Sequence, residues 1–102
     1  MEVINLKNAI KVPFNLDGHL LFNSEKADLV HLCLHPGQII ERHSNPIQVV
    51  FFVLEGEGTF FFNEREIIST VNDCFTVLPG ELRGWQNHTA NDLKLLVFKL
   101  KN

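Results

Sequence analysis

Residues 37–58 read GQIIERHSNPIQVVFFVLEGEG and residues 72–88 read NDCFTVLPGELRGWQNH, and these two stretches give the clearest indication of the fold. In each of them, short runs of β-branched and aromatic residues alternate with Pro, Gly, Asn and Asp. Val, Ile, Phe and Trp favour extended backbone, whereas the separating residues favour tight turns. Both stretches therefore predict short β-strands joined by turns.

The same pattern extends to most of the chain. The expected strands are Val30–His35, Gln48–Leu54, Thr59–Phe62, Glu66–Ser69, Phe75–Leu78 and Leu93–Leu100. No window shows the apolar periodicity of a helix, so we expect less than about a tenth of the chain to be helical. Residues 8–23 are less regular, and Asp17-Gly18 is expected to form a turn. A chain of 102 residues with these elements predicts one all-β domain, a sandwich or a barrel, over residues 1–102.

Composition and charge exclude several classes of function. The nine Lys and Arg residues are scattered singly and the formal net charge is −3, so nucleic-acid binding is not expected. No apolar run approaches 18 residues, and residues 1–12 lack a signal-peptide pattern, which predicts a cytoplasmic protein without a membrane segment. In that compartment Cys33 and Cys74 should be reduced thiols.

The two stretches resemble the two motifs of the cupin family. In the first, five residues separate Gly37 from His43, and the segment closes on Gly56. In the second, Asn72 takes the place of a Gly, Pro79-Gly80 lies in register, and Asn87 matches the final Asn. The resemblance implies a double-stranded β-helix, the RmlC-like jelly-roll barrel, with motif 1 at 37–58 and motif 2 at 72–88.

The resemblance also implies where a metal would be bound, and the residues there are unsuitable. The family's ligand positions fall on His43, Asn45, Val49 and Arg83. Val has no donor atom, Asn is a weak ligand, and Arg is a permanent cation. We therefore expect no cofactor in the barrel. The alternative, a divalent transition metal held by atypical ligands, would need a β-bulge between Asn45 and Val49 to turn Gln48 inward.

The same positions, read by strand alternation, predict a ligand pocket. Its expected lining residues are His43, Asn45, Val49, Phe51, Arg83, Trp85 and Asn87. An apolar cavity with a few convergent polar groups is typical of a small-molecule site. A guanidinium inside it needs an acceptor, which is either Glu41 or Glu81 of the chain, or a carboxylate or phosphate on a ligand.

Three functions follow from this pocket, in order of preference. The first is binding of a small anionic organic ligand, in a binding or regulatory role. The second is a metal-free isomerase or epimerase, in which His43 acts as the base and Glu41 orients it. The epimerase branch of the family also uses a Tyr acid, and this chain has no Tyr. The third is a metal-dependent enzyme with atypical ligands.

Two further features concern the outside of the barrel. Alternation places His31, Cys33 and His35 opposite an apolar lining, and so at the surface or at a subunit contact. The segments Val49–Leu54 and Leu95–Phe98 are apolar on both faces. Their outer face is covered either by a second copy, which predicts a homodimer, or by the N-terminal segment.

Overall fold

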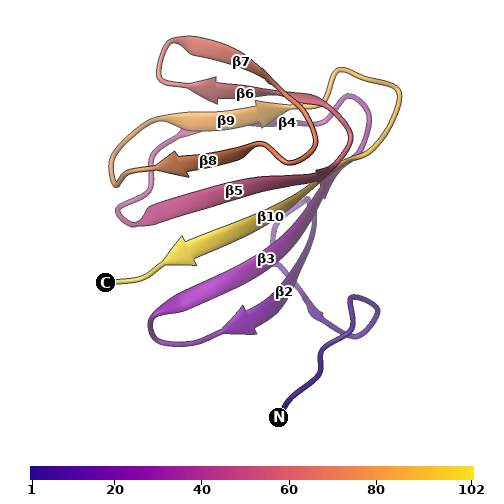
Figure 1. The fold of residues 1–102 in the computed structure, drawn as a ribbon, viewed down its shortest axis with the longest axis vertical. Coiled ribbons are helices and arrows are strands. Elements are labelled where there is room, and N and C mark those ends of the chain that lie inside the picture. Colours follow the sequence, from indigo (N-terminus) through magenta and orange to yellow (C-terminus); the bar gives the residue numbers. More distant parts are fainter.

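Ten antiparallel strands and no helix make up the structure, a computed structural model that describes residues 1–102. One sheet contains, in spatial order, β1 (Ile10–Lys11), β2 (Asp17–Asn23), β3 (Ala27–Leu34), β10 (Leu93–Leu100), β5 (Gln48–Glu55) and β8 (Cys74–Val77). The other contains β4 (Ile39–His43), β9 (Arg83–Gln86), β6 (Gly58–Phe62) and β7 (Arg65–Ser69). The expected all-β fold is confirmed, and there is no helix that could span a membrane (Figure 1).

The core lies between the two sheets and follows the alternation expected for half-buried strands. In β5 every second residue, Val49, Phe51 and Val53, is buried. The facing sheet contributes Phe60 and Trp85, whose ring centroids are 4.8 Å apart. Because Trp85 also packs edge-on against Phe51, the aromatic residues join the two layers.

All six expected strands are present, but four others were missed. These are β1, β2, β4 and β9. The turn expected at Asp17-Gly18 is wrong, because these residues begin β2. A Cβ on Gly18 would lie 2.7 Å from Val12 Cγ2, so this glycine permits close approach of the preceding segment rather than reversal of the chain.

The backbone at two Asn residues supports the expected turns. Asn63, in the β6–β7 hairpin, has a φ of 53°, and Asn72, before β8, has a φ of 76°. Asn is among the few residues other than Gly that tolerate this left-handed conformation. Asn72 can therefore occupy a position at which Gly would be expected.

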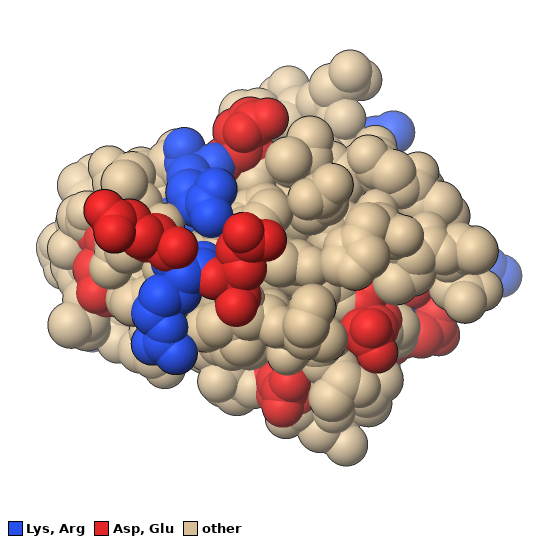
Figure 2. Space-filling view, turned by 90° about the horizontal axis from the view of Figure 1, so that it is seen from above, with Lys and Arg blue, Asp and Glu red and all other residues tan.

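The charged residues form no extended patch of one sign on the face seen in Figure 2. On the left of this face Lys and Arg side chains lie beside Asp and Glu, other charged side chains stand apart, and most of the face consists of uncharged residues. This face therefore lacks the basic stripe that is typical of nucleic-acid-binding surfaces.

Candidate ligand-binding site

A cavity of about 530 Å³ opens between the two sheets. Ten of its fifteen lining residues are hydrophobic, and none is acidic. Four of the residues expected from the sequence line it, namely His43, Phe51, Arg83 and Trp85. Its size and its mainly apolar wall are typical of small-molecule sites.

Arg83 is the buried charge of this cavity. The residue is 4% exposed, and its Nη1 donates a 3.0 Å hydrogen bond to the backbone carbonyl of His43. Its Nε has no hydrogen-bond partner, and none of the five ion pairs of the structure includes Arg83. Burial lowers the pKa of the guanidinium, which still remains a cation at neutral pH.

Neither of the internal partners considered for Arg83 pairs with it. The Glu81 carboxylate accepts a 2.8 Å hydrogen bond from the backbone N–H of Leu78, and Glu41 is exposed. The guanidinium is therefore buried without a compensating negative charge from this chain. Such a group is costly unless an acceptor reaches it.

Trp85 adds a second unpaired donor. The residue is 1% exposed, and its indole Nε1 has no hydrogen-bond partner. Trp85 and Arg83 are two residues apart in β9, so their side chains share the inner face of the sheet. Two residues of the cavity wall, both from β9, thus each carry a buried N–H donor without a hydrogen-bond partner.

His43 lies at the exposed side of the cavity with a defined orientation. Its Nδ1 lies 3.1 Å from the backbone carbonyl of Glu41. Because a carbonyl only accepts hydrogen bonds, Nδ1 carries the proton and Nε2 is left as an acceptor in the neutral ring.

The position expected for Glu41, on the same face as His43, is wrong because β4 contains a β-bulge. Ile40 pairs with Trp85 and His43 pairs with Arg83, so three steps along β4 match two along β9. The extra residue breaks the alternation that had placed Glu41 on the face of His43. It also explains Gly84, where a Cβ would lie 3.0 Å from the Arg42 backbone nitrogen and closer still to the Ile40 carbonyl oxygen. Glu41 does not line the cavity, and the His43–Glu41 side-chain dyad is not formed.

Three other expected lining residues lie outside the cavity wall. Val49 is fully buried in the core, and Asn45 Oδ1 accepts a hydrogen bond from the Ile47 backbone N–H. Asn87 is also fully buried, and its amide nitrogen donates to the Leu34 carbonyl at 2.9 Å and to the Asn91 carbonyl at 2.7 Å. Its Oδ1 accepts hydrogen bonds from the backbone N–H and the hydroxyl of Thr89. All hydrogen-bonding groups of the Asn87 side chain are therefore satisfied within the protein.

The side chains at the family's ligand positions do not fit a metal ion. Val49 offers no donor and sits in the apolar core, Asn45 is engaged by Ile47, and Arg83 brings a positive charge to the site. No β-bulge is present between Asn45 and Val49 to turn Gln48 inward, and Gln48 does not line the cavity. His43 is the one strong ligand left at these positions.

Several residues of the cavity wall, from outside the two cupin motifs, were not predicted from the sequence. Val12, Phe14, Asn15 and Leu16, between β1 and β2, form part of the wall, as does Lys99 of β10. The N-terminal segment carried no usable periodic signal. Lys99 could have been found, because alternation puts it on the same face as the buried Leu95 and Val97.

Comparison with known families identifies the class of protein. A family model described as "Cupin domain" matches residues 30–99. The chain therefore belongs to the cupin family, as the two motifs had indicated. Comparison with curated proteins gives no match.

Solved structures show the same fold over nearly the whole chain. TT1209 from Thermus thermophilus is 26% identical, with a TM-score of 0.84 over 99% of this chain and 98% of that one. A predicted oxalate decarboxylase from Thermotoga maritima is 19% identical, with a TM-score of 0.89 over 99% and 100% of the two chains. The polyketide cyclase RemF from Streptomyces resistomycificus is 13% identical, with a TM-score of 0.88 over 100% and 80%. The last two identities establish a shared fold and no more.

Proposed function

We propose that this protein binds a small organic anion in the cavity between its sheets, with the Arg83 guanidinium as the principal contact. The observation that carries the proposal is the buried Arg83, whose Nε lacks a partner and which no carboxylate of the chain neutralises. An entering anion would gain a charge-assisted and potentially bidentate pair with a group that is already desolvated.

The wall of the cavity favours a carboxylate on an apolar body. Lys99 adds a second cation to a wall that contains no Asp or Glu, which favours negative charge. The hydrophobic majority of the wall, including Phe51 and Trp85, favours an apolar or aromatic scaffold over a sugar phosphate. Nε2 of His43 is then available for a polar substituent, and the buried indole N–H of Trp85 is a further donor without a partner in the wall.

A catalytic role for His43 is the second candidate, and one observation favours it. Nδ1 is held by the Glu41 carbonyl, so Nε2 is a fixed acceptor at the cavity and could take a proton from a bound ligand. No acidic side chain orients the ring from the other side. The structural neighbours include proteins described as a polyketide cyclase and as a predicted oxalate decarboxylase, which illustrates how widely chemistry varies on this fold.

The experiment uses the only Trp of the chain as its reporter. Because there is one Trp, no Tyr, and Trp85 lines the cavity, intrinsic fluorescence reports occupancy directly. A panel of aromatic and aliphatic carboxylates, with sugar phosphates as a second arm, is screened by thermal shift and then by fluorescence titration. A ligand at 100 times its Kd should stabilise the protein by about 2.7 kcal/mol and raise Tm by about 10 °C.

Matched variants assign the effect to Arg83. Arg83→Met should abolish the response to carboxylates, whereas Arg65→Met, which removes an exposed Arg from β7, should leave it unchanged. An equal response in the wild type and Arg83→Met would overturn the proposal. Turnover of a bound ligand that His43→Gln abolishes, with binding retained, would establish the catalytic role.

A further inference from the structure

The outer surface of the six-stranded sheet carries a second group of polar side chains, separate from the cavity. Leu32 and Leu34 of β3 belong to the core, so Cys33 and the following His35 project from the opposite side of the strand. Cys33 is nevertheless only 5% exposed. Both cysteines of the chain are free thiols.

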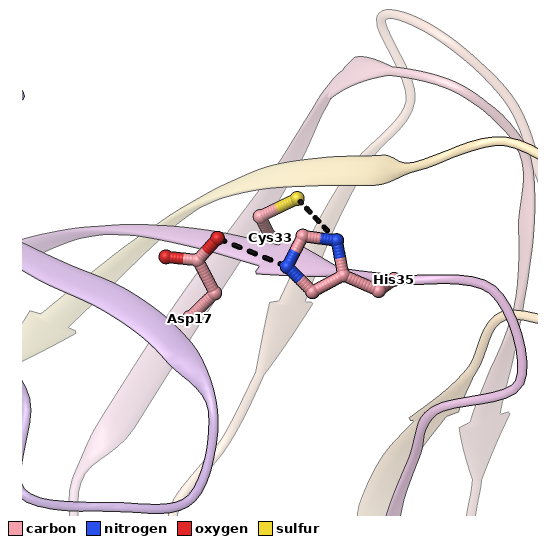
Figure 3. Close-up of side chains that lie close together, drawn as sticks. All are labelled: Asp17, Cys33 and His35. Carbon is pink, nitrogen blue, oxygen red and sulfur yellow. Dashed lines mark hydrogen bonds and ion pairs between the residues drawn. The ribbon is translucent and has the colours of Figure 1, made fainter.

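Topology brings three strand ends together at this place. Asp17, the first residue of β2, is directly opposite Cys33 in the β2–β3 ladder. Leu34 pairs with Leu93 at the start of β10, which places Asp92 beside His35. The close-up in Figure 3 shows the Asp17, Cys33 and His35 side chains converging there.

The distances between the side chains are those of a compact cluster. Asp17, Cys33 and His35 each offer one ligand atom, and these atoms all lie within 4.8 Å of one another. His35 Nε2 is 3.1 Å from Asp17 Oδ2, and His35 Nδ1 is 3.9 Å from Cys33 Sγ and 2.9 Å from Asp92 Oδ1. Ligand atoms of a tetrahedral zinc lie about 3.5 Å apart, so side-chain movements of about 1 Å would bring this group around one ion.

We propose that Asp17, Cys33 and His35 form a zinc-binding site on the outside of the barrel, oriented by Asp92. A thiolate, an imidazole and a carboxylate are the three ligand types that zinc uses in proteins, whereas Mg²⁺ and Ca²⁺ require oxygen ligands. Asp92 contacts Nδ1 of the His35 ring, which leaves Nε2, the nitrogen beside Asp17, as the zinc ligand, and the Cys33 side chain would turn from its contact with Nδ1 toward that position. Asp17 and His35 are partly exposed, so the ion and a coordinated water can enter from solvent.

The charges around the cluster favour a cation. Two carboxylates contact the His35 ring, with Asp17 Oδ2 3.1 Å from Nε2 and Asp92 Oδ1 2.9 Å from Nδ1, and neither of them pairs with a Lys or Arg. Zinc would replace the thiol proton and any proton on Nε2 of His35, and these protons would leave to solvent.

Zinc titration of the wild type, purified without a metal-binding tag, tests the proposal. Competition against a chromophoric chelator should show one equivalent bound, and Co²⁺ in place of zinc should give a thiolate-to-cobalt charge-transfer band. Cys33→Ser should remove that band and weaken zinc binding by about 100-fold or more, and Asp92→Asn should weaken it by about 10- to 100-fold.

Two control variants locate the ion. Cys74→Ser alters the other free thiol, in β8, and His43→Ala alters the strongest ligand of the cavity; both should bind zinc like the wild type. Thermal unfolding verifies that each variant is folded. If Cys33→Ser does not fold, Asp17→Asn provides a substitution at a partly exposed position instead. Loss of the band in Cys74→Ser, loss of zinc in His43→Ala, or equal zinc affinity in the wild type and the folded Cys33 or Asp17 variant would each overturn the proposal.

Discussion

Arg83 pairs with His43 across strands β9 and β4, and Arg83 Nη1 donates a 3.0 Å hydrogen bond to the His43 backbone carbonyl. This bond holds the guanidinium against the inner face of the smaller sheet without neutralising its charge. The arrangement places a cation where other members of the family would use a metal ligand. The cavity therefore contains a positive charge that no carboxylate of the chain pairs with, and several predictions depend on it.

The stability of the ligand-free protein should reveal whether Arg83 is paired. We expect Arg83→Met to change the free energy of unfolding by less than about 1 kcal/mol, or to increase it, because the variant removes a buried unpaired charge and keeps most of the side-chain volume. Urea denaturation monitored by far-UV circular dichroism measures this. A loss of about 3 kcal/mol would instead indicate that a carboxylate is orphaned by the substitution.

Asn87 should prove important for stability. Its fully buried amide makes four hydrogen bonds, to Leu34, Asn91 and Thr89, that join β3 to the segment before β10. Asn87→Ala should therefore destabilise the protein by about 2–3 kcal/mol in chemical denaturation. Asn91 contributes only backbone groups to this network and is exposed, so Asn91→Ala should cost less than about 0.5 kcal/mol.

Metal content should not depend on the cavity. Elemental analysis of purified wild type and His43→Ala should give the same Fe, Mn, Ni, Cu and Zn content, since Val49 and Arg83 leave His43 without strong co-ligands. A stoichiometric metal that disappears in His43→Ala would show that residues away from the motif positions complete a site in the barrel.

The outer face of the larger sheet should mediate formation of a homodimer. Phe52 pairs with Leu96 in the β5–β10 ladder, and the adjacent Phe98 is 37% exposed. The N-terminal segment gives little cover of its own, because residues 1–8 are themselves exposed. Light scattering should give the mass of a dimer, whose interface buries more than about 1,000 Å² in total. Phe98→Glu should shift the mass to that of a monomer, and a wild-type monomer at micromolar concentration would contradict the prediction.

Strands with strong local signals could be predicted from the sequence alone. β5 and β10 contain consecutive β-branched and aromatic residues bounded by turn formers, so their positions needed no tertiary information. β2 and β4 could not be found in this way. Their sequences, DGHLLFN and IIERH, mix polar and apolar residues without alternation. β2 and β4 form through pairing with β3 and β9.

The candidate site, like the strands, could be predicted from the sequence only in part. The cupin fold and the mismatch between metal chemistry and Val49 or Arg83 could be read from the chain alone, because residue identity at a motif position is enough to exclude a ligand. Alternation also placed Phe51 and Trp85 inward. The bulge that removes Glu41 from the face of His43 could not be foreseen, since one extra residue in a strand leaves no reliable signal in composition.

Which polar groups are satisfied became clear only in three dimensions. Asn87 and Arg83 looked equivalent as polar residues of one motif, yet the first has every hydrogen bond filled by the fold and the second has an unpaired Nε. The cluster of Asp17, Cys33 and His35 likewise joins the start of β2 to the end of β3 and the residue after it, which only the pairing of these strands brings into contact. Hydrogen bonding and coordination act over about 3 Å, so they depend on register and packing, which local sequence patterns do not contain.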